Sequence, residues 1–211
     1  MAQNATINAG DEPLFRSAHE ALVFAYNFSL QASTPMTPVA KLMRGPVGPG
    51  RGLGGLDGAG QAGIIRAKIA ELGKVGAAII TARIAPRTTK CECRAACCSG
   101  LRPNREWADA LSTLADTIRH TALAGCTSDG IMRREYVLRY FSHRSERAPL
   151  EELARKYSID RHTVGAHYAK VTRWLRGDTR YSAEGADFSG MEQWAFDAIT
   201  QKLIDAGIVG A

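Results

Sequence analysis

The sequence contains no apolar run long enough to cross a lipid bilayer. Apart from a short run at residues 21 to 26, the longest uncharged apolar stretch covers residues 75 to 82, whereas a membrane-spanning helix needs about 20 such residues. The residues before the first run also lack the basic start of a secretory signal. We therefore expect a cytoplasmic protein that does not contact a membrane.

The alternation of apolar and polar residues that is typical of strands is missing as well. Apolar residues instead recur every three or four positions, as on one face of a helix. Asn104 is a helix-capping candidate, and Gly207 follows the last periodic segment. The segments with this periodicity cover residues 14 to 29, 57 or 61 to 72, 75 to 84, 105 to 123 and 191 to 206. The fold class is therefore predicted to be all-α.

Proline and glycine divide the chain into regions. Four prolines and nine glycines lie between residues 33 and 63, a composition that favours a flexible connection. The first helix is expected to be capped by Asp11 and to admit Pro13 in its first turn. The predicted regions are an N-terminal helix at 1–32, a linker at 33–60, a helical region at 61–128 with a cysteine-rich loop at 87–104, a helix-turn-helix unit at 129–180 and a C-terminal helix at 189–211.

Positive charge is concentrated in one part of the chain. Residues 131 to 180 contain twelve Lys and Arg side chains against six Asp and Glu, and this excess of +6 equals the net charge of the whole chain. A basic segment can neutralise nucleic-acid phosphates and release their counterions. A solvated charged surface without a ligand has the same composition, so charge alone leaves both interpretations open.

The segment at residues 150 to 175 has the spacing of a helix-turn-helix. This motif needs a small residue in its first helix, a tight turn about four residues later and an apolar anchor on each side of the turn. Ala154 is the small residue and Ser158 lies at the turn. Ile159 and Val164 are the apolar anchors. An ordinary helical hairpin remains the alternative, because such spacings occur in many helical proteins.

The second helix of this motif is expected to begin at residue 160 or 161. Its inward positions are Val164, Tyr168, Val171 and Leu175. In a recognition helix the N-terminal residues reach base edges and later basic residues contact phosphates. The candidate base-reading residues are Arg161, His162, Thr163 and Ala166. The candidate phosphate contacts are Lys170 and Arg173.

This segment resembles the helix-turn-helix of sigma factor region 4, through Leu153-Ala154-x-x-x-Ser158-Ile159 and then Thr163-Val164 with His167. A wider resemblance, to the antitermination Q proteins of lambdoid phages, includes the cysteine cluster and the run Arg133-Arg134-x-Tyr-Val-Leu-Arg-Tyr-Phe141. The resemblance implies a small helical protein that binds DNA and loads onto RNA polymerase. It also implies zinc, which some members of that family hold through cysteines.

Four of the five cysteines lie within eight residues. A reducing compartment disfavours disulfides and favours metal binding or catalysis for clustered thiols. A structural zinc ion needs four ligands. Cys126 can replace one of the clustered cysteines if the helix before it folds back onto the loop. The zinc-bound loop is expected to join the N-terminal helices to the DNA-binding half. Buried or redox-sensitive thiols and a catalytic cysteine are the alternatives. The candidate zinc ligands are Cys91, Cys93, Cys97, Cys98 and Cys126.

The predicted function is that of a sequence-specific DNA-binding transcription regulator, of phage or prophage antitermination type. Its expected partners are double-stranded DNA and, through the resemblance, RNA polymerase. No histidine stands beside a cysteine as a local partner for nucleophilic catalysis, and we expect no enzyme activity. The alternative is a zinc-stabilised interaction protein whose basic face binds RNA or an acidic protein.

Overall fold

The computed structural model describes residues 13–31, 55–91, 93, 95, 98–178 and 189–210. These residues are mostly helical, as the periodicity predicts. None of the described helices is long and apolar enough to span a membrane. The helices are α1 (Ala18–Gln31), α3 (Gly55–Ala70), α4 (Gly73–Ile84), α5 (Arg105–His120), α6 (Gly130–Phe141), α7 (Leu150–Lys156), α8 (Arg161–Arg176) and α9 (Met191–Asp205), with a short 3-10 helix η1 (Arg144–Glu146).

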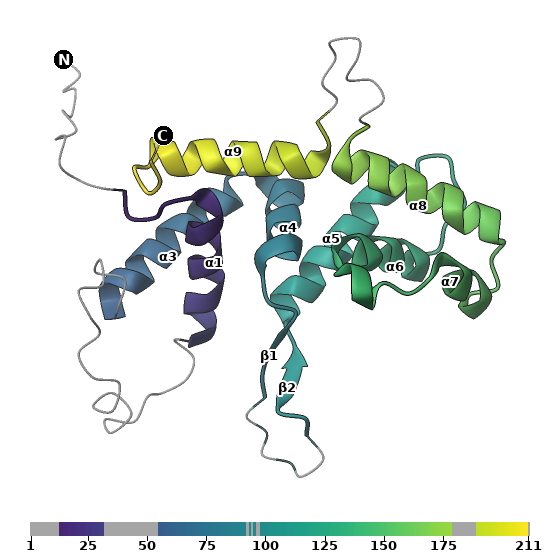
Figure 1. Cartoon of the computed structure of the whole chain (residues 1–211), viewed down its shortest axis with the longest axis horizontal. Coiled ribbons are helices and arrows are strands. Elements are labelled where there is room, and N and C mark those ends of the chain that lie inside the picture. Colours follow the sequence, from purple (N-terminus) through teal and green to yellow (C-terminus); the bar gives the residue numbers. More distant parts are fainter. Residues whose placement is uncertain are drawn as a thin grey trace.

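The helices α4 and α5 form the middle of the molecule. Figure 1 shows α1 and α3 on one side of them and α6, α7 and α8 on the other, while α9 lies across the ends of α3 and α4. Ile79 and Ile80 of α4 and Leu111 and Leu114 of α5 are completely buried. The apolar stripes of these helices therefore pack together in one continuous core that connects both sides.

The start of the chain differs from the prediction. Residues 13 to 17 are not helical, and α1 begins only at Ala18. Phe15 instead pairs with Val209 near the other end of the chain, and its backbone N–H donates to the carbonyl of Ile208 at 3.2 Å. The expected cap, Asp11, lies outside the described residues. The predicted linker is also too long, because α3 begins at Gly55.

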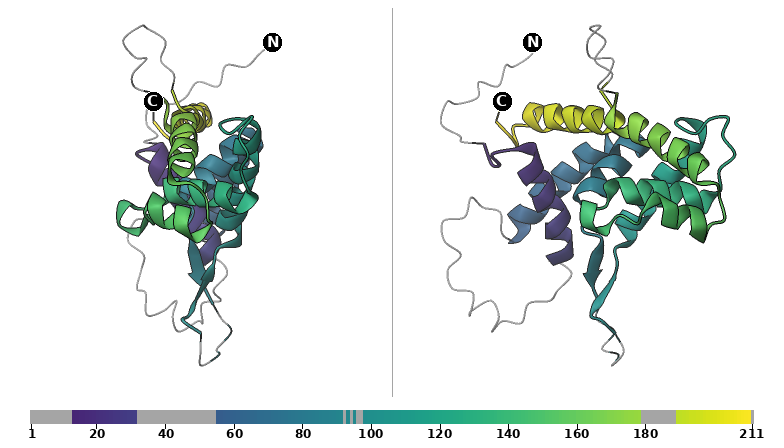
Figure 2. Two further views of the ribbon diagram at one scale, coloured as in Figure 1. Left: turned by 90° about the vertical axis from the view of Figure 1, so that its right-hand side faces the viewer. Right: turned by 45° about the vertical axis from the view of Figure 1, so that its right-hand side comes forward.

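Two short strands form a hairpin where only a loop was expected. Strand β1 (Thr88–Lys90) pairs antiparallel with β2 (Leu101–Pro103). Three residues per strand are too few to produce a recognisable alternation, which explains why the sequence did not reveal them. The hairpin projects from the helical body in every view of the molecule (Figures 1 and 2).

Asn104 fixes the base of this hairpin. Its side-chain oxygen caps α5 by accepting from the N–H of Glu106 at 3.1 Å, and its Nδ2 donates to the carbonyl of Pro86 at 2.7 Å. Trp107 adds a hydrogen bond from its Nε1 to the carbonyl of Ala82 at 3.2 Å. The end of α4 is thereby held against the first turn of α5, and the hairpin leaves the body between them.

Candidate functional site

A tight turn joins α7 to α8. Ser158 has a φ of 52°, in the left-handed region that non-glycine residues rarely adopt, and the N–H of Ile159 donates to the carbonyl of Ala154 at 2.9 Å. Asp160 then caps α8 by accepting from the N–H of Thr163 at 2.9 Å. This N–H lowers the pKa of the Asp160 carboxyl. The turn and the start of the second helix lie where the sequence predicts them.

The inner face of α8 is apolar. Val164, Val171 and Leu175 are completely buried, which anchors α8 in the core. Tyr168 is only half-buried, and the guanidinium of Arg139 lies over its ring, 5.1 Å from the centroid. The ring of Tyr136 on α6 meets His167 edge to face at 6.1 Å, and burial lowers the pKa of His167. These contacts fix the rotation of α8 about its own axis.

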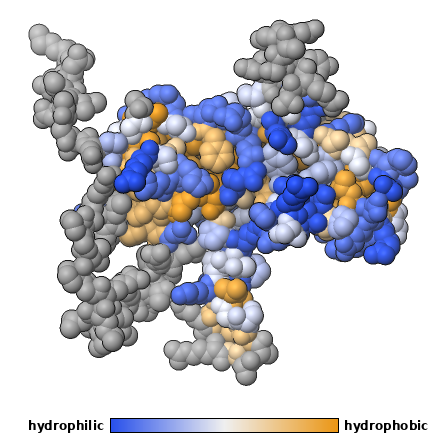
Figure 3. Space-filling model, in the orientation of Figure 1, coloured by the Kyte–Doolittle hydropathy of each residue, from blue (hydrophilic) through white to orange (hydrophobic). Residues whose placement is uncertain are grey.

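The outer face of α8 is open to solvent. Figure 3 shows strongly hydrophilic residues where α6, α7 and α8 lie, whereas apolar surface gathers mainly over the half with α1 and α3. Two of the exposed cations form ion pairs, Arg161 with Glu151 at 2.8 Å and Arg173 with Asp178 at 3.0 Å. Every candidate DNA-contacting residue is exposed on this face: Arg161, His162, Thr163, Ala166, Lys170 and Arg173.

Of the twelve Lys and Arg side chains in residues 131 to 180, three have structural roles. Arg133 is buried and donates from Nε to the carbonyl of Ala115 at 3.1 Å. Arg139 donates to the carbonyl of Ala148, and Arg147 donates to the carbonyl of Ser142 at 3.0 Å. Because these guanidinium groups donate to backbone carbonyls, they are not free to contact phosphates. The sequence count therefore overstates the charge available to a ligand.

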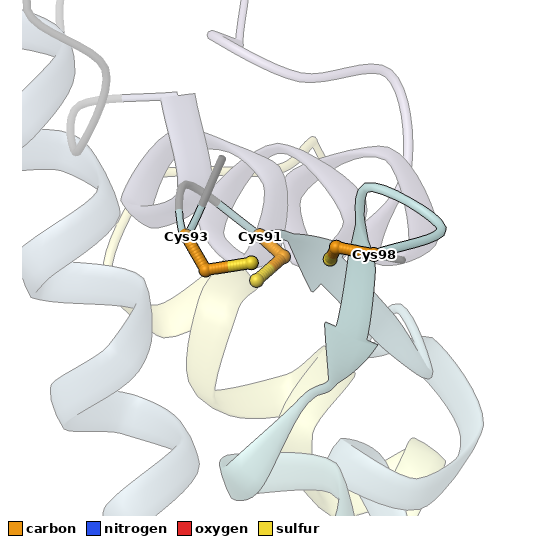
Figure 4. A group of neighbouring side chains, drawn as sticks. All are labelled: Cys91, Cys93 and Cys98. Atoms are coloured by element: carbon orange, nitrogen blue, oxygen red, sulfur yellow. The ribbon is translucent and has the colours of Figure 1, made fainter. Parts of the chain in front are cut away.

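Three of the clustered cysteines point toward one another at the end of the hairpin (Figure 4). The Sγ atoms of Cys91, Cys93 and Cys98 all lie within 4.8 Å of one another. The N–H of Cys91 donates to the carbonyl of Gly100 at 2.8 Å, and the N–H of Gly100 lies 3.4 Å from the Sγ of Cys98. Gly100 has a φ of 75°, so it permits the chain to turn back here.

The pKa values of two thiols in this cluster are shifted in opposite directions. The pKa of Cys93 is lowered, first by the backbone N–H of Ala95 and then by hydrogen bonds from the other two thiols. The pKa of Cys91 is raised: the N–H of Cys93 lowers it, but the neighbouring sulfur atoms outweigh that effect. Cys93 therefore loses its proton at a lower pH than Cys91. Such a cluster can hold a thiophilic metal ion through three sulfur ligands.

The two remaining cysteines are not part of this group. Cys97 lies outside the described residues. Cys126 was wrongly predicted to approach the cluster, because it follows the C-terminal end of α5 whereas the hairpin precedes the N-terminal end, and a 16-residue helix is about 24 Å long. The Nζ of Lys170 instead donates to the Sγ of Cys126 at 3.2 Å. The cluster also lies at a projecting tip, so it does not join the two halves.

Several contacts at these sites have no signal in the sequence. Arg87, at the start of the hairpin, forms an ion pair with Glu146 of η1, 59 residues away, and donates to the carbonyl of Phe141 at 3.0 Å. The ion pairs of Arg161 and Arg173 with acids outside α8 also depend on the folded arrangement.

Comparisons of this chain with protein-family models, curated proteins and solved structures give no match.

Proposed function

We propose that the chain is a sequence-specific regulator of transcription that binds duplex DNA by inserting α8 into the major groove. The observation that supports this most strongly is the outer face of α8: its N-terminal half is exposed directly after a tight turn, while its inner face is anchored by three completely buried side chains. The major groove is about 12 Å wide and admits one α-helix. A helix supported on one side only is able to enter it.

The roles of the exposed residues follow from their positions on α8. Arg161, His162, Thr163 and Ala166 lie in its first two turns, where a recognition helix contacts base edges. Lys170 and Arg173 lie further along and are placed to meet the phosphate backbone. The ion pair of Arg161 with Glu151 is solvent-exposed and contributes about 0–1 kcal/mol, whereas in the pair of Arg173 with Asp178 the cation is exposed and the carboxylate is mostly buried. A phosphate can therefore replace Glu151 as the partner of Arg161 at little cost.

The resemblance to antitermination Q proteins extends this proposal to RNA polymerase. In that view the chain binds DNA near a promoter and then acts with the polymerase. The α6 to α8 unit, which contains the run that resembles those proteins, supports the DNA-binding step. Loading onto polymerase rests on the resemblance alone.

The proposed metal is a structural zinc ion held at the hairpin tip. Cys91, Cys93 and Cys98 supply three of its ligands, and Cys97, in the same loop, is the candidate for the fourth. Thiolates hold zinc at about 2.3 Å, and metal binding contributes directly to folding where the site does not exist in the unfolded chain. The ion would order a hairpin whose strands have only three residues each.

Alanine substitutions on α8 test the DNA-binding proposal. We expect Arg161→Ala to cost about 1–3 kcal/mol on cognate DNA only and so to relax specificity, whereas Arg173→Ala should weaken cognate and random duplex equally and reduce the salt slope by about one. Arg16→Ala, at an exposed site before α1, is the matched control. Affinities are measured by fluorescence anisotropy against salt, on duplex selected from the source genome and on random duplex.

Two results would contradict this assignment. If Arg161→Ala and Arg173→Ala had identical effects on cognate and random duplex, α8 would not be the recognition helix. If the protein bound single-stranded RNA or an acidic protein but had no salt-dependent affinity for any duplex, the zinc-stabilised interaction protein would be the better description.

A further inference from the structure

The metal-binding hairpin is attached to the α6–α8 unit. Arg87 at its base forms an ion pair with Glu146 and donates to the carbonyl of Phe141, and its guanidinium lies 5.6 Å from the ring of Trp107. These contacts tie the hairpin to the segment that connects α6 to α7. Arg144, in the same segment, is exposed. The hairpin therefore has a defined direction relative to α7 and α8.

The strands of the hairpin also have positive charge. Strands β1 and β2 contain two cations, Lys90 and Arg102, and no acid, whereas Arg87 and Arg105 beside them are already paired with Glu146 and Asp109. A zinc ion with the four thiolates proposed above would have a net charge of −2, so the positive charge of the hairpin lies on its strands and not at its tip. Lys90 and Arg102 are exposed. Within residues 13–31, 55–91, 98–178 and 189–210, neither of them forms an ion pair with an acidic side chain.

The strand register places these cations on both faces of the hairpin. Thr89 is opposite Arg102, and Lys90 is opposite Leu101, while side chains alternate between faces along each strand. The Nε of Arg102 donates to Oγ1 of Thr89 at 3.3 Å, which steadies the guanidinium. No residue of either strand is buried. The hairpin therefore offers positive charge to a ligand on either side and buries little apolar surface of its own.

We infer that this hairpin is a second DNA-contacting element, in which Lys90 and Arg102 bind phosphates of the duplex that flanks the α8 site. The inference rests on the proposed function of α8. Duplex phosphate is favoured over single-stranded RNA because strands β1 and β2 contain no aromatic ring on which an unpaired base could stack. It is favoured over a protein because Leu101 is the single large apolar side chain exposed on these strands, too little for an interface core.

The test is a salt titration of duplex binding with the double variant Lys90→Ala/Arg102→Ala. Each lost phosphate contact should reduce the slope of log K against log salt by about 0.9, so the variant should lose roughly two from the wild-type slope. The ratio of cognate to random affinity should not change. Arg16→Ala/Lys74→Ala removes the same charge from two exposed positions on the other half of the molecule and is the control for net charge.

The possible results separate the hairpin from α8. An unchanged slope in the hairpin variant, together with normal wild-type duplex binding, would overturn this inference and leave the proposed function intact. An equal loss in the control variant would also overturn it, because net charge alone would then explain the effect. A wild-type protein without duplex affinity would overturn both. Loss of single-stranded RNA binding, with duplex binding unchanged, would reassign the hairpin to RNA.

Discussion

Among changes to α6, removal of the Tyr136 hydroxyl is expected to give the largest gain in stability. Tyr136 is completely buried, and its hydroxyl has no hydrogen-bond partner among the residues that the structure describes. Burial without a hydrogen bond costs a hydroxyl about 1–3 kcal/mol in proteins. The substitution Tyr136→Phe removes the oxygen and keeps the ring against His167. We therefore expect it to raise the free energy of unfolding by about 1–2 kcal/mol.

Tyr140, one turn further along α6, provides a matched control. Its hydroxyl donates to Oε2 of Glu192 on α9 at 2.6 Å. Tyr140→Phe removes the same atom but leaves a half-buried carboxylate without this donor. Hydrogen bonds to charged groups contribute about 1.5–3 kcal/mol, so this substitution should lower the free energy of unfolding by about that amount. The two changes are chemically identical and should have opposite signs.

Urea and thermal unfolding measure both effects. In a chain of this size 1 kcal/mol corresponds to roughly 2–4 °C in Tm. Burial raises the pKa of Tyr136 to about 12, so the neutral hydroxyl is favoured in the folded state and wild-type stability should fall as the pH rises from 10 toward 12. Tyr136→Phe should lose part of that decrease. A loss of 1 kcal/mol or more at pH 7 would show that the hydroxyl has a partner and refute this reasoning.

Substitutions at two further positions test the local structure around the sites. Asn104→Ala should lower the free energy of unfolding by about 1–3 kcal/mol, because it removes the cap of α5 and the hydrogen bond to Pro86; an unchanged urea midpoint would contradict this. Ser158→Gly should raise that free energy by up to about 1 kcal/mol, because a left-handed φ costs a non-glycine residue about 1–2 kcal/mol. Ser158→Val should lower the free energy of unfolding. Equal urea midpoints for the two Ser158 variants would show that the backbone at this position is not strained.

The parts of the fold that the sequence predicted well depend on local interactions. Asn104 and Asp160 cap their helices within three residues of themselves, and Ser158 takes the turn conformation within its own backbone. The inner positions of α8 follow a helical period that is visible in the sequence. Such features need no knowledge of the rest of the chain, and this is why the turn and the exposed face of α8 could be predicted.

The features that the sequence did not predict depend on distant residues. Phe15 leaves the expected helix because it pairs with Val209, and Arg87 orients the hairpin through Glu146. Cys126 is separated from the cluster by the full length of α5, whose direction is set by packing against α4 and α6. Sequence spacing gives the number of residues between two cysteines but not the path between them, so the ligand set could not be derived from spacing alone.

The position of the cysteine cluster predicts what metal removal will do. Because the strands of the hairpin contain no buried residue, loss of the proposed zinc ion should disorder strands β1 and β2 without unfolding the helical core. Cys98→Ser should lower the zinc content of protein purified without chelator from one ion per chain toward none, and should speed amide hydrogen exchange in the hairpin. Cys126→Ser should change neither, because its thiol contacts Lys170.

Thermal unfolding with and without a chelator decides between this local role and a global one. If zinc orders only the hairpin, the main transition should shift by no more than roughly 2–4 °C, the equivalent of about 1 kcal/mol, while hydrogen exchange in the hairpin changes strongly. A large shift of the main transition, or loss of zinc in Cys126→Ser, would mean that the metal joins the two halves of the molecule after all. Since α4 and α5 already connect these halves through completely buried side chains, we expect the local result.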